Sequence, residues 1–202
     1  MPGGCFVKAL KMVVVGDGGC GKTSLQTVFT EGHFSEIYVP TVSEIFSAQF
    51  NCGSLLLEIN MWDTAGKQDY DRLRPLCYQG ANVVLICYDV SNPASFHHVL
   101  TRWLPELRQF CPGTPMFLVA CKKDLRMDKI CQRQLNKAGQ QIITSTQGLT
   151  MADQICAAGF LECSAKLEEK VVETFHDAVL AAFTGCSRTR VKRKSERSCL
   201  VS

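Results

Sequence analysis

The feature that most constrains this chain is a glycine-rich loop that directly follows a short apolar run. Met12–Val15 has the length of a buried strand, and the loop after it consists of Gly16, Asp17, Gly18, Gly19, Cys20, Gly21, Lys22 and Thr23. This is the pattern G-x-x-x-x-G-K-[ST], in which backbone N–H groups surround phosphate oxygens, the lysine reaches the β- and γ-phosphates, and the hydroxyl ligates Mg²⁺. An ordinary glycine-rich turn is the alternative. A strand, this loop and a helix in succession predict a nucleotide-binding α/β domain without selecting the base.

Four further apolar blocks of strand length recur, with helical segments between them: Leu55–Trp62, Val83–Tyr88, Met116–Cys121 and Phe160–Cys163. Nearly continuous hydrophobicity is typical of parallel strands that are covered on both faces. Ile45–Phe50 and Leu55–Met61 flank the turn Asn51-Cys52-Gly53, which predicts a hairpin and one antiparallel edge strand. We therefore predict a doubly wound α/β fold with a six-stranded, mainly parallel sheet.

Helices are expected at four places: after Gly21, after Asn92-Pro93, near Thr150 and after Lys166. The last one spaces its large apolar side chains four residues apart, as a helix packed on a sheet does: Val171, Phe175, Val179 and Phe183. Residues 126–147 are longer than a typical connection and predict an extra surface helix. His97 and His98 have no partner at ligand spacing, so we expect them on an exposed helix face.

Length and charge separate a globular body from a tail. A chain of 202 residues with 46% hydrophobic and 20% charged residues excludes fibrous and disordered classes. Residues 186–202 hold six basic side chains and one acidic one, a net +5, so the rest of the chain carries −2 of the overall +3. This distribution predicts a tail that seeks an anionic surface and argues against a body that binds nucleic acid.

Cysteine usage and hydropathy indicate a cytosolic chain. The twelve cysteines lack CxxC spacing, Lys8 and Lys11 interrupt the apolar N-terminal run, and no run approaches the ~18–20 apolar residues of a membrane span. Membrane contact is therefore expected to be peripheral or through a lipid. Cys20, beside Lys22 at a predicted helix N-terminus, is either a redox-sensitive thiol with a lowered pKa or an inert loop cysteine.

The segment Trp62–Gly66 ends one apolar block with the sequence Trp-Asp-Thr-Ala-Gly. At the end of a strand that faces the phosphate loop, Asp63 is placed to hold Mg²⁺ through a water molecule. Gly66 leaves a backbone N–H free to approach a γ-phosphate. An ordinary turn is the alternative for this segment alone.

Two further motifs, Cys121–Asp124 and Glu162–Lys166, end the next strands. Asp124 can accept hydrogen bonds from guanine N1–H and N2–H₂, which adenine does not offer, while Lys122 and Lys166 would lie along the plane of the base. Because all of these motifs fall at successive strand ends, where open α/β sheets bind ligands, they favour guanine over a P-loop kinase or ATPase.

At these residues the chain resembles the small GTPases of the Ras superfamily, and among them the Rho family. The Rho-like marks are Phe34, Tyr38–Val42 with Glu44, Asp69–Leu76, Trp103–Glu106 and the insert near 126–140. Cys20, Leu85–Val90 and Cys121 are most similar to the Rif and RhoD branch. The resemblance implies a GTP-binding P-loop domain over 8–184 with a Rho-type insert helix, a short extension over 1–7 and a polybasic hypervariable tail over 185–202.

The resemblance also implies a GDP/GTP switch that uses Mg²⁺. The GTP-binding residues that it implies are Gly16, Asp17, Gly18, Gly19, Cys20, Gly21, Lys22, Thr23, Ser24, Phe34, Tyr38, Thr41, Asp63, Gly66, Lys122, Asp124, Leu125, Ser164, Ala165 and Lys166. The metal would be held by Thr23 and Thr41 directly and by Asp63 through water. Thr41 would sense the γ-phosphate in the first switch. Gly66 would sense it in the second switch, which covers residues 63–78. The implied effector region is Tyr38, Val39, Pro40, Thr41, Val42, Ser43 and Glu44, in which Ser43 replaces a usual aromatic residue and leaves the set of effectors open.

Residue 67 departs from the family pattern. Relatives have a glutamine there that orients the attacking water, whereas this chain has Lys67 followed by Gln68. An ammonium has no acceptor for a water proton, so we expect slow hydrolysis and a weak response to an arginine finger. The catalytic candidates are Lys67, Lys22 and Thr41, with Gln68 as the residue that would rescue the water. The alternative to a cycling switch is a GTP-loaded binding module that scarcely hydrolyses.

The C-terminus Cys199-Leu200-Val201-Ser202 fits the C-a-a-X pattern, and its final serine points to farnesyl rather than geranylgeranyl. One lipid and the basic residues together would hold the chain on the cytoplasmic face of the plasma membrane or endosomes, beside a cytosolic pool. A nuclear address is the alternative for Arg190–Lys194, and Cys186 is a candidate for palmitoylation. The partners implied by resemblance are exchange factors, GTPase-activating proteins and actin-regulating effectors such as formins, with roles in actin organisation, protrusions and vesicle or endosome movement.

Overall fold

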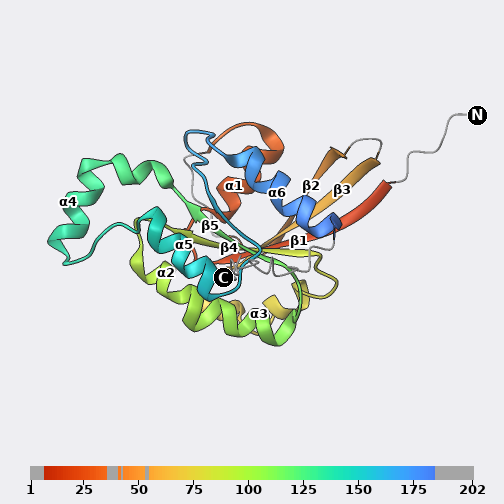
Figure 1. The fold of residues 1–202 in the computed structure, drawn as a ribbon, viewed down its shortest axis with the longest axis horizontal. Helices are drawn as coiled ribbons and strands as arrows, with labels where there is room; N and C mark the ends of the chain where they lie inside the picture. The colour runs from red at the N-terminus through yellow and green to blue at the C-terminus, as the bar shows by residue number, and fades with distance from the viewer. Residues whose placement is uncertain (1–6, 36–40, 42, 53–54, 185–202) are drawn as a thin grey trace, which may run out of the picture.

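The computed structural model describes residues 7–35, 41, 43–52 and 55–184, in which six strands form one sheet with helices on both faces (Figure 1). The strands are β1 (Val7–Gly16), β2 (Ser43–Cys52), β3 (Leu55–Thr64), β4 (Val83–Asp89), β5 (Met116–Cys121) and β6 (Gly159–Glu162). Their order across the sheet is β2-β3-β1-β4-β5-β6, and every neighbouring pair is parallel except β2 with β3. The predicted sheet, with one antiparallel edge strand, is confirmed. The predicted turn Asn51-Cys52-Gly53 is placed too early, because Asn51 and Cys52 still belong to β2 and pair with Leu56 and Leu55 of β3.

Helices cover the sheet in two layers. In Figure 1, α1 (Lys22–Glu31) and α6 (Val171–Thr184) lie over one face, and α2 (Pro93–His98), α3 (Leu104–Phe110) and α5 (Ser145–Gln154) lie over the other. The remaining short elements are the 3₁₀ helices η1 (Gln68–Tyr70), η2 (Arg74–Cys77) and η4 (Lys123–Met127) and the π-helical turn η3 (Val99–Trp103). The π turn comes just before Pro105, which has no N–H to donate to the helix. Of the helices that the structure describes, none is long and apolar enough to cross a membrane.

The apolar run of β1 is buried on both faces of the sheet, which explains why apolar and polar residues do not alternate along it. Met12 and Val14 join the core beneath α1 and α6, while Val13 and Val15 join the core beneath α3 and α5. On the first side Phe175 of α6 stacks on Phe29 of α1, with ring centroids 4.1 Å apart. The apolar stripe predicted for α6 belongs to this core, as expected.

One helix boundary differs from the prediction. The helix expected near Thr150 begins at Ser145, because Thr144 caps it there. The Thr144 hydroxyl accepts from the N–H of Gln147 at 3.2 Å, and the Gln147 side chain accepts from the N–H of Thr144 at 2.8 Å. This reciprocal pair satisfies two backbone donors that the helix cannot pair internally, so the helix starts one turn earlier.

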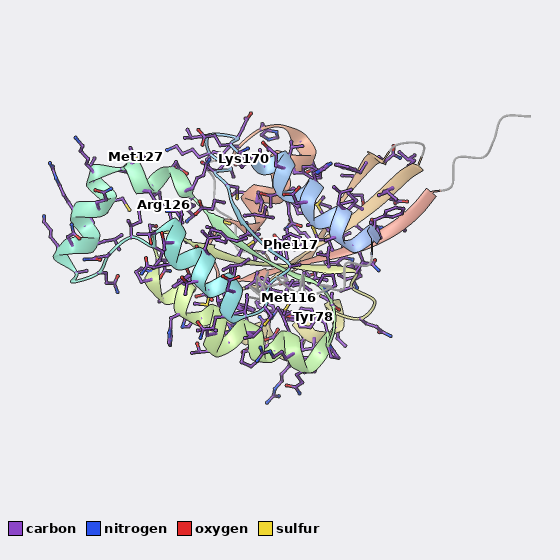
Figure 2. The ribbon with its side chains drawn as sticks, viewed as in Figure 1. Tyr78, Met116, Phe117, Arg126, Met127 and Lys170 are labelled. Carbon is purple, nitrogen blue, oxygen red and sulfur yellow. The ribbon has the colours of Figure 1, made fainter. Side chains whose placement is uncertain are left out.

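The predicted extra helix is α4 (Lys129–Lys137), which begins after the capping residue Asp128. None of its residues is buried, which agrees with a surface insert. Figure 1 shows α4 standing away from the sheet, and Figure 2 shows Arg126 and Met127 where this arm leaves the body of the domain. The Rho-type insert is thus an addition at one end of the domain.

Candidate nucleotide-binding site

The phosphate loop connects β1 to α1 in a backbone conformation that suits glycine. Gly16, Gly19 and Gly21 have φ angles of 142°, 76° and 109°, values that other residues rarely adopt. The buried ammonium of Lys22 donates hydrogen bonds to the carbonyl oxygens of Gly16 at 2.8 Å and Asp17 at 3.0 Å. The positive charge of the Lys22 ammonium therefore lies directly against the backbone of the phosphate loop.

Oxygen atoms from three segments meet beside this loop. The hydroxyl of Thr23 on α1 donates to Asp63 Oδ2 at 2.5 Å and lies 2.8 Å from the hydroxyl of Thr41. Asp63 is buried at the end of β3, and its Oδ1 has no hydrogen-bond partner among the described residues. Burial raises the pKa of Asp63 and outweighs the opposing effects of Thr23 and Lys22. Two hydroxyls and an incompletely paired carboxylate are the hard oxygen ligands that Mg²⁺ prefers.

The segment after β3 lies directly against the phosphate loop. A Cβ on Gly66 would be 2.3 Å from the backbone nitrogen of Gly18 and 2.5 Å from the carbonyl oxygen of Gly16, so this contact requires glycine. Lys67 follows with an exposed side chain. Gln68 begins η1, and its side chain lies outside the described structure.

A buried arginine anchors the rest of this segment. Arg74 is 2% exposed and donates to Glu106 at 2.7 and 2.6 Å, to Asp71 Oδ1 at 2.6 Å and to the carbonyl oxygen of Ala65 at 2.9 Å. Burial opposes the charge on Arg74, but its bonds to Glu106 and Asp71 outweigh burial and raise its pKa. Tyr78, labelled in Figure 2, also donates to Glu106. These contacts fix η2 to α3 through one carboxylate.

The ends of β5 and β6 form the part of the site where the nucleotide base is expected, here called the base side. Lys122, at a φ of 58°, donates to the carbonyl oxygen of Gly19 at 2.8 Å and to Asp89 Oδ2 at 2.7 Å. Asp124 accepts a hydrogen bond from the Ser164 hydroxyl at 2.6 Å, which orients the carboxylate and leaves it further lone pairs. A cavity of about 130 Å³ lies beside them and is lined by Gly21, Ser24, Leu25, Phe34, Cys121, Lys122, Asp124, Leu125, Cys163, Ala165 and Lys166.

Comparison with known proteins agrees with this geometry. The family model described as Ras family matches residues 11–183. The chain belongs to the Ras family. The human Rho-related GTP-binding protein RhoF is 50% identical over 194 residues, which cover 96% of this chain and 92% of that relative. Human RhoD is 42% identical over 196 residues (97% and 93%), and RHO1 of Saccharomyces cerevisiae is 49% identical over 184 residues (91% and 88%).

These relatives confirm the predicted resemblance to the Rif and RhoD branch of the Rho family. The protein is a Rho-type small GTPase, a member of a class of GTP hydrolases that bind GTP and GDP.

Several predicted residues of this small GTPase lie outside the described part of the chain: Tyr38, Val39, Pro40, Val42, Cys186 and Cys199. The others that were expected to contact nucleotide or metal lie on the phosphate loop, at the ends of β3, β5 and β6, or on the segments beside them. Ser43 and Glu44 begin β2 with exposed side chains. The structure therefore brings both ends of the expected nucleotide site together and leaves part of the segment before β2, where the first switch was expected, outside the described residues.

The sequence did not reveal the partners of Asp17. Trp103 Nε1 donates to Asp17 Oδ1 at 2.9 Å, and His98 Nδ1 lies 2.6 Å from Oδ2. We expected His98 on an exposed helix face without a partner at ligand spacing. It lies on α2 as a half-buried side chain, and its partner Asp17 is 81 positions away in the sequence. Arg102 lies 4.0 Å from Asp17 Oδ1 and donates to the carbonyl oxygen of Gly66 at 3.0 Å. The helical segment formed by α2 and η3 thus holds both the phosphate loop and the segment after β3, through contacts between residues as much as 86 positions apart.

Cys20 does not have the lowered pKa that its place at a helix N-terminus suggested. Burial raises the pKa of its thiol to about 12, despite the charge of Lys22. The thiol lies beneath the loop and donates to the carbonyl oxygen of Cys87 at 3.6 Å. The alternative of an inert loop cysteine is the one that this geometry favours.

Proposed function

We propose that this chain is a GTP/GDP switch that uses Mg²⁺ and hydrolyses GTP slowly. The observation that carries the proposal is that Lys22, the hydroxyl and carboxylate oxygens around Asp63, and Asp124 all border one glycine loop. Asp124 supports guanine, because its remaining lone pairs can accept from N1–H and N2–H₂ of that base. Lys22 supports a polyphosphate beside the loop.

Mg²⁺ would be held by the hydroxyls of Thr23 and Thr41, with Asp63 acting through water. When bound, the ion would neutralise charge on the phosphates. Lys22 would stabilise negative charge that develops during phosphoryl transfer, and Thr41 would order the first switch. Because loss of the γ-phosphate removes contacts from Thr41 and Gly66, both switch segments would loosen, and partners would detect the change.

Lys67 supports slow hydrolysis. Its ammonium can offset phosphate charge, but it has no lone pair to accept a proton from an attacking water. Its side chain is exposed next to Gly66, whose backbone lies against the phosphate loop. The same observation favours a second candidate, a GTP-loaded binding module that is controlled by abundance, nucleotide exchange or lipidation.

The substitution Lys67→Gln tests the role of this residue. An amide both donates and accepts hydrogen bonds, so we expect phosphate release from GTP to rise at least about tenfold, and further with an activating protein, whose arginine finger is worth about 10³–10⁵ in rate. Single-turnover phosphate release measures both rates. Lys129→Gln on α4 is the matched control and should leave the rate unchanged. Equal rates for wild type and Lys67→Gln would contradict the proposal, and co-purified GTP rather than GDP would select the second candidate.

We further infer that residues 8–184 act as the GTP-binding domain, between an extension over 1–7 and a membrane-seeking tail over 185–202. Six basic residues and the Cys199 box support peripheral attachment to anionic membranes, with actin organisation, protrusion and vesicle or endosome movement as the cellular roles. Exchange factors, activating proteins and formin-like effectors would be the partners. Cys199→Ser is expected to move a tagged chain from membrane to cytosol in cell fractionation, and retention at the membrane would contradict lipid anchoring.

A further inference from the structure

Four buried cysteines lie beneath the nucleotide site: Cys20, Cys87, Cys121 and Cys163. All four are free thiols within one apolar core. Two of them, Cys121 and Cys163, also line the cavity on the base side. None has a part in the proposed hydrolysis of GTP.

The strand register places Cys121 directly beside Cys163. The paired residues of β5 and β6 end with Ala120 and Glu162, and the N–H of Cys163 donates to the carbonyl oxygen of Ala120 at 2.9 Å. Cys121 and Cys163 each follow one residue of this last pair on parallel strands, so their side chains share one face of the sheet. Neighbouring strands are about 4.8 Å apart, within the Cα separation of about 4.4–6.8 Å that a disulfide spans. In the register of β4 with β5, Cys121 pairs with Asp89, two residues after Cys87, so Cys87 is only a diagonal neighbour of Cys121.

Of the two thiols, Cys121 has the lower pKa and contacts the phosphate loop. Interaction with the thiols of Cys163 and Cys87, aided by the charge of Lys122, lowers the pKa of Cys121 against the opposing effects of burial and Asp89. Interaction with Cys121, followed by burial, raises the pKa of Cys163. A Cβ on Gly21 would be 3.4 Å from the Cβ of Cys121, so this cysteine also packs against the phosphate loop.

We propose that Cys121 and Cys163 form an oxidant-sensitive pair at the floor of the base cavity, and that hydrogen peroxide reaches these buried thiols through this cavity when no nucleotide fills it. The Cys121 thiolate attacks a peroxide oxygen, so that an S–O bond forms, the O–O bond breaks, and the leaving hydroxide takes up a proton to become water. The Cys163 sulfur then attacks the Cys121 sulfur. The S–S bond forms, the S–O bond breaks, and the hydroxyl leaves as water with the thiol proton of Cys163. Two thiols are oxidised by two electrons, and one peroxide is reduced to two waters.

The disulfide would loosen nucleotide binding, a consequence that rests on the proposed function. A disulfide brings the two Cβ atoms to about 3.8 Å, closer than most pairs of side chains on adjacent strands. The loops that carry Asp124 and Lys166 follow these two cysteines directly, so they would move with the strand ends. Peroxide would therefore act on the empty site and delay reloading, while bound nucleotide would shield the pair.

The test compares the full chain loaded with GDP and the chain stripped of nucleotide. Both are exposed to graded hydrogen peroxide, and disulfides are located by non-reducing peptide mass spectrometry with fragmentation. We expect a Cys121–Cys163 disulfide that dithiothreitol reverses and that forms at least fivefold faster without nucleotide. The oxidised chain should release a fluorescent GDP analogue at least tenfold faster than the reduced chain.

Variants separate the two thiols. In Cys163→Ser, oxidised Cys121 should persist as a sulfenic acid that dimedone traps, and Cys156→Ser, which removes an exposed thiol, should form the disulfide as wild type does. Oxidation confined to Cys156, a disulfide from Cys121 to Cys87 or Cys20, or equal rates with and without GDP would overturn the proposal. If the reduced chain binds no GDP analogue, the proposed function fails, while the peptide masses still decide whether the thiol pair exists.

Discussion

The base side and the phosphate side of the nucleotide site differ in how far the protein satisfies its own polar groups. On the base side, Lys122 bonds to Gly19 and Asp89, and Asp124 bonds to Ser164. On the phosphate side, Asp63 keeps a buried carboxylate oxygen without a partner among the described residues. The base side is therefore organised before any ligand arrives, which suits specificity. The phosphate side is completed by what binds there, which suits a sensor of the γ-phosphate.

The largest expected effect concerns Arg74, whose guanidinium anchors the segment after β3 on the phosphate side. Arg74→Ala should lower the free energy of unfolding by about 3–5 kcal/mol, because it leaves the largely buried carboxylate of Glu106 uncompensated and the carbonyl of Ala65 without this donor. Urea unfolding of the GDP-saturated protein measures this loss. Arg72→Ala, two residues away and exposed, is the control and should change stability by less than about 0.5 kcal/mol. Similar losses in both variants would show that the anchor contributes no more than a surface charge.

The next effect tests the organisation of the base side. Asp124→Ala should weaken GDP binding about 100-fold, close to 3 kcal/mol, because hydrogen bonds to a charged group are worth about 1.5–3 kcal/mol each. Titration with a fluorescent GDP analogue gives the affinity. Asp153→Ala, on the exposed side of α5, should bind as wild type does. Unchanged affinity in Asp124→Ala would remove the argument for guanine.

The two sides also differ in what the sequence could predict. The phosphate loop and the base motifs could be located because each is a short local pattern at the end of an apolar strand. The contacts of Asp17 with His98 and Trp103 could not, because they join residues 81 and 86 positions apart and depend on how α2 and η3 pack. The start of α5 was missed although its signal is local, since Thr144 and Gln147 form a capping pair.

The smallest expected effect separates stability from function on the phosphate side. Burial raises the pKa of Asp63, so the folded chain binds this proton more readily than the unfolded chain does. Its stabilising contribution is complete below the unfolded pKa of about 3.9 and is lost as the pH rises through the raised folded value. At neutral pH the charged carboxylate therefore costs stability when no ion is bound. Asp63→Asn should raise the Tm of the nucleotide-free, Mg²⁺-free protein by about 2–4 °C, for a gain of about 1 kcal/mol, and should remove most of the stabilisation by Mg²⁺ and GDP. The gain in Tm should be smaller at pH 4 than at pH 7, and the control Asp153→Asn should show no change in Tm at either pH. A lower Tm for metal-free Asp63→Asn at pH 7 would mean that the unpaired oxygen of Asp63 does not destabilise the folded protein.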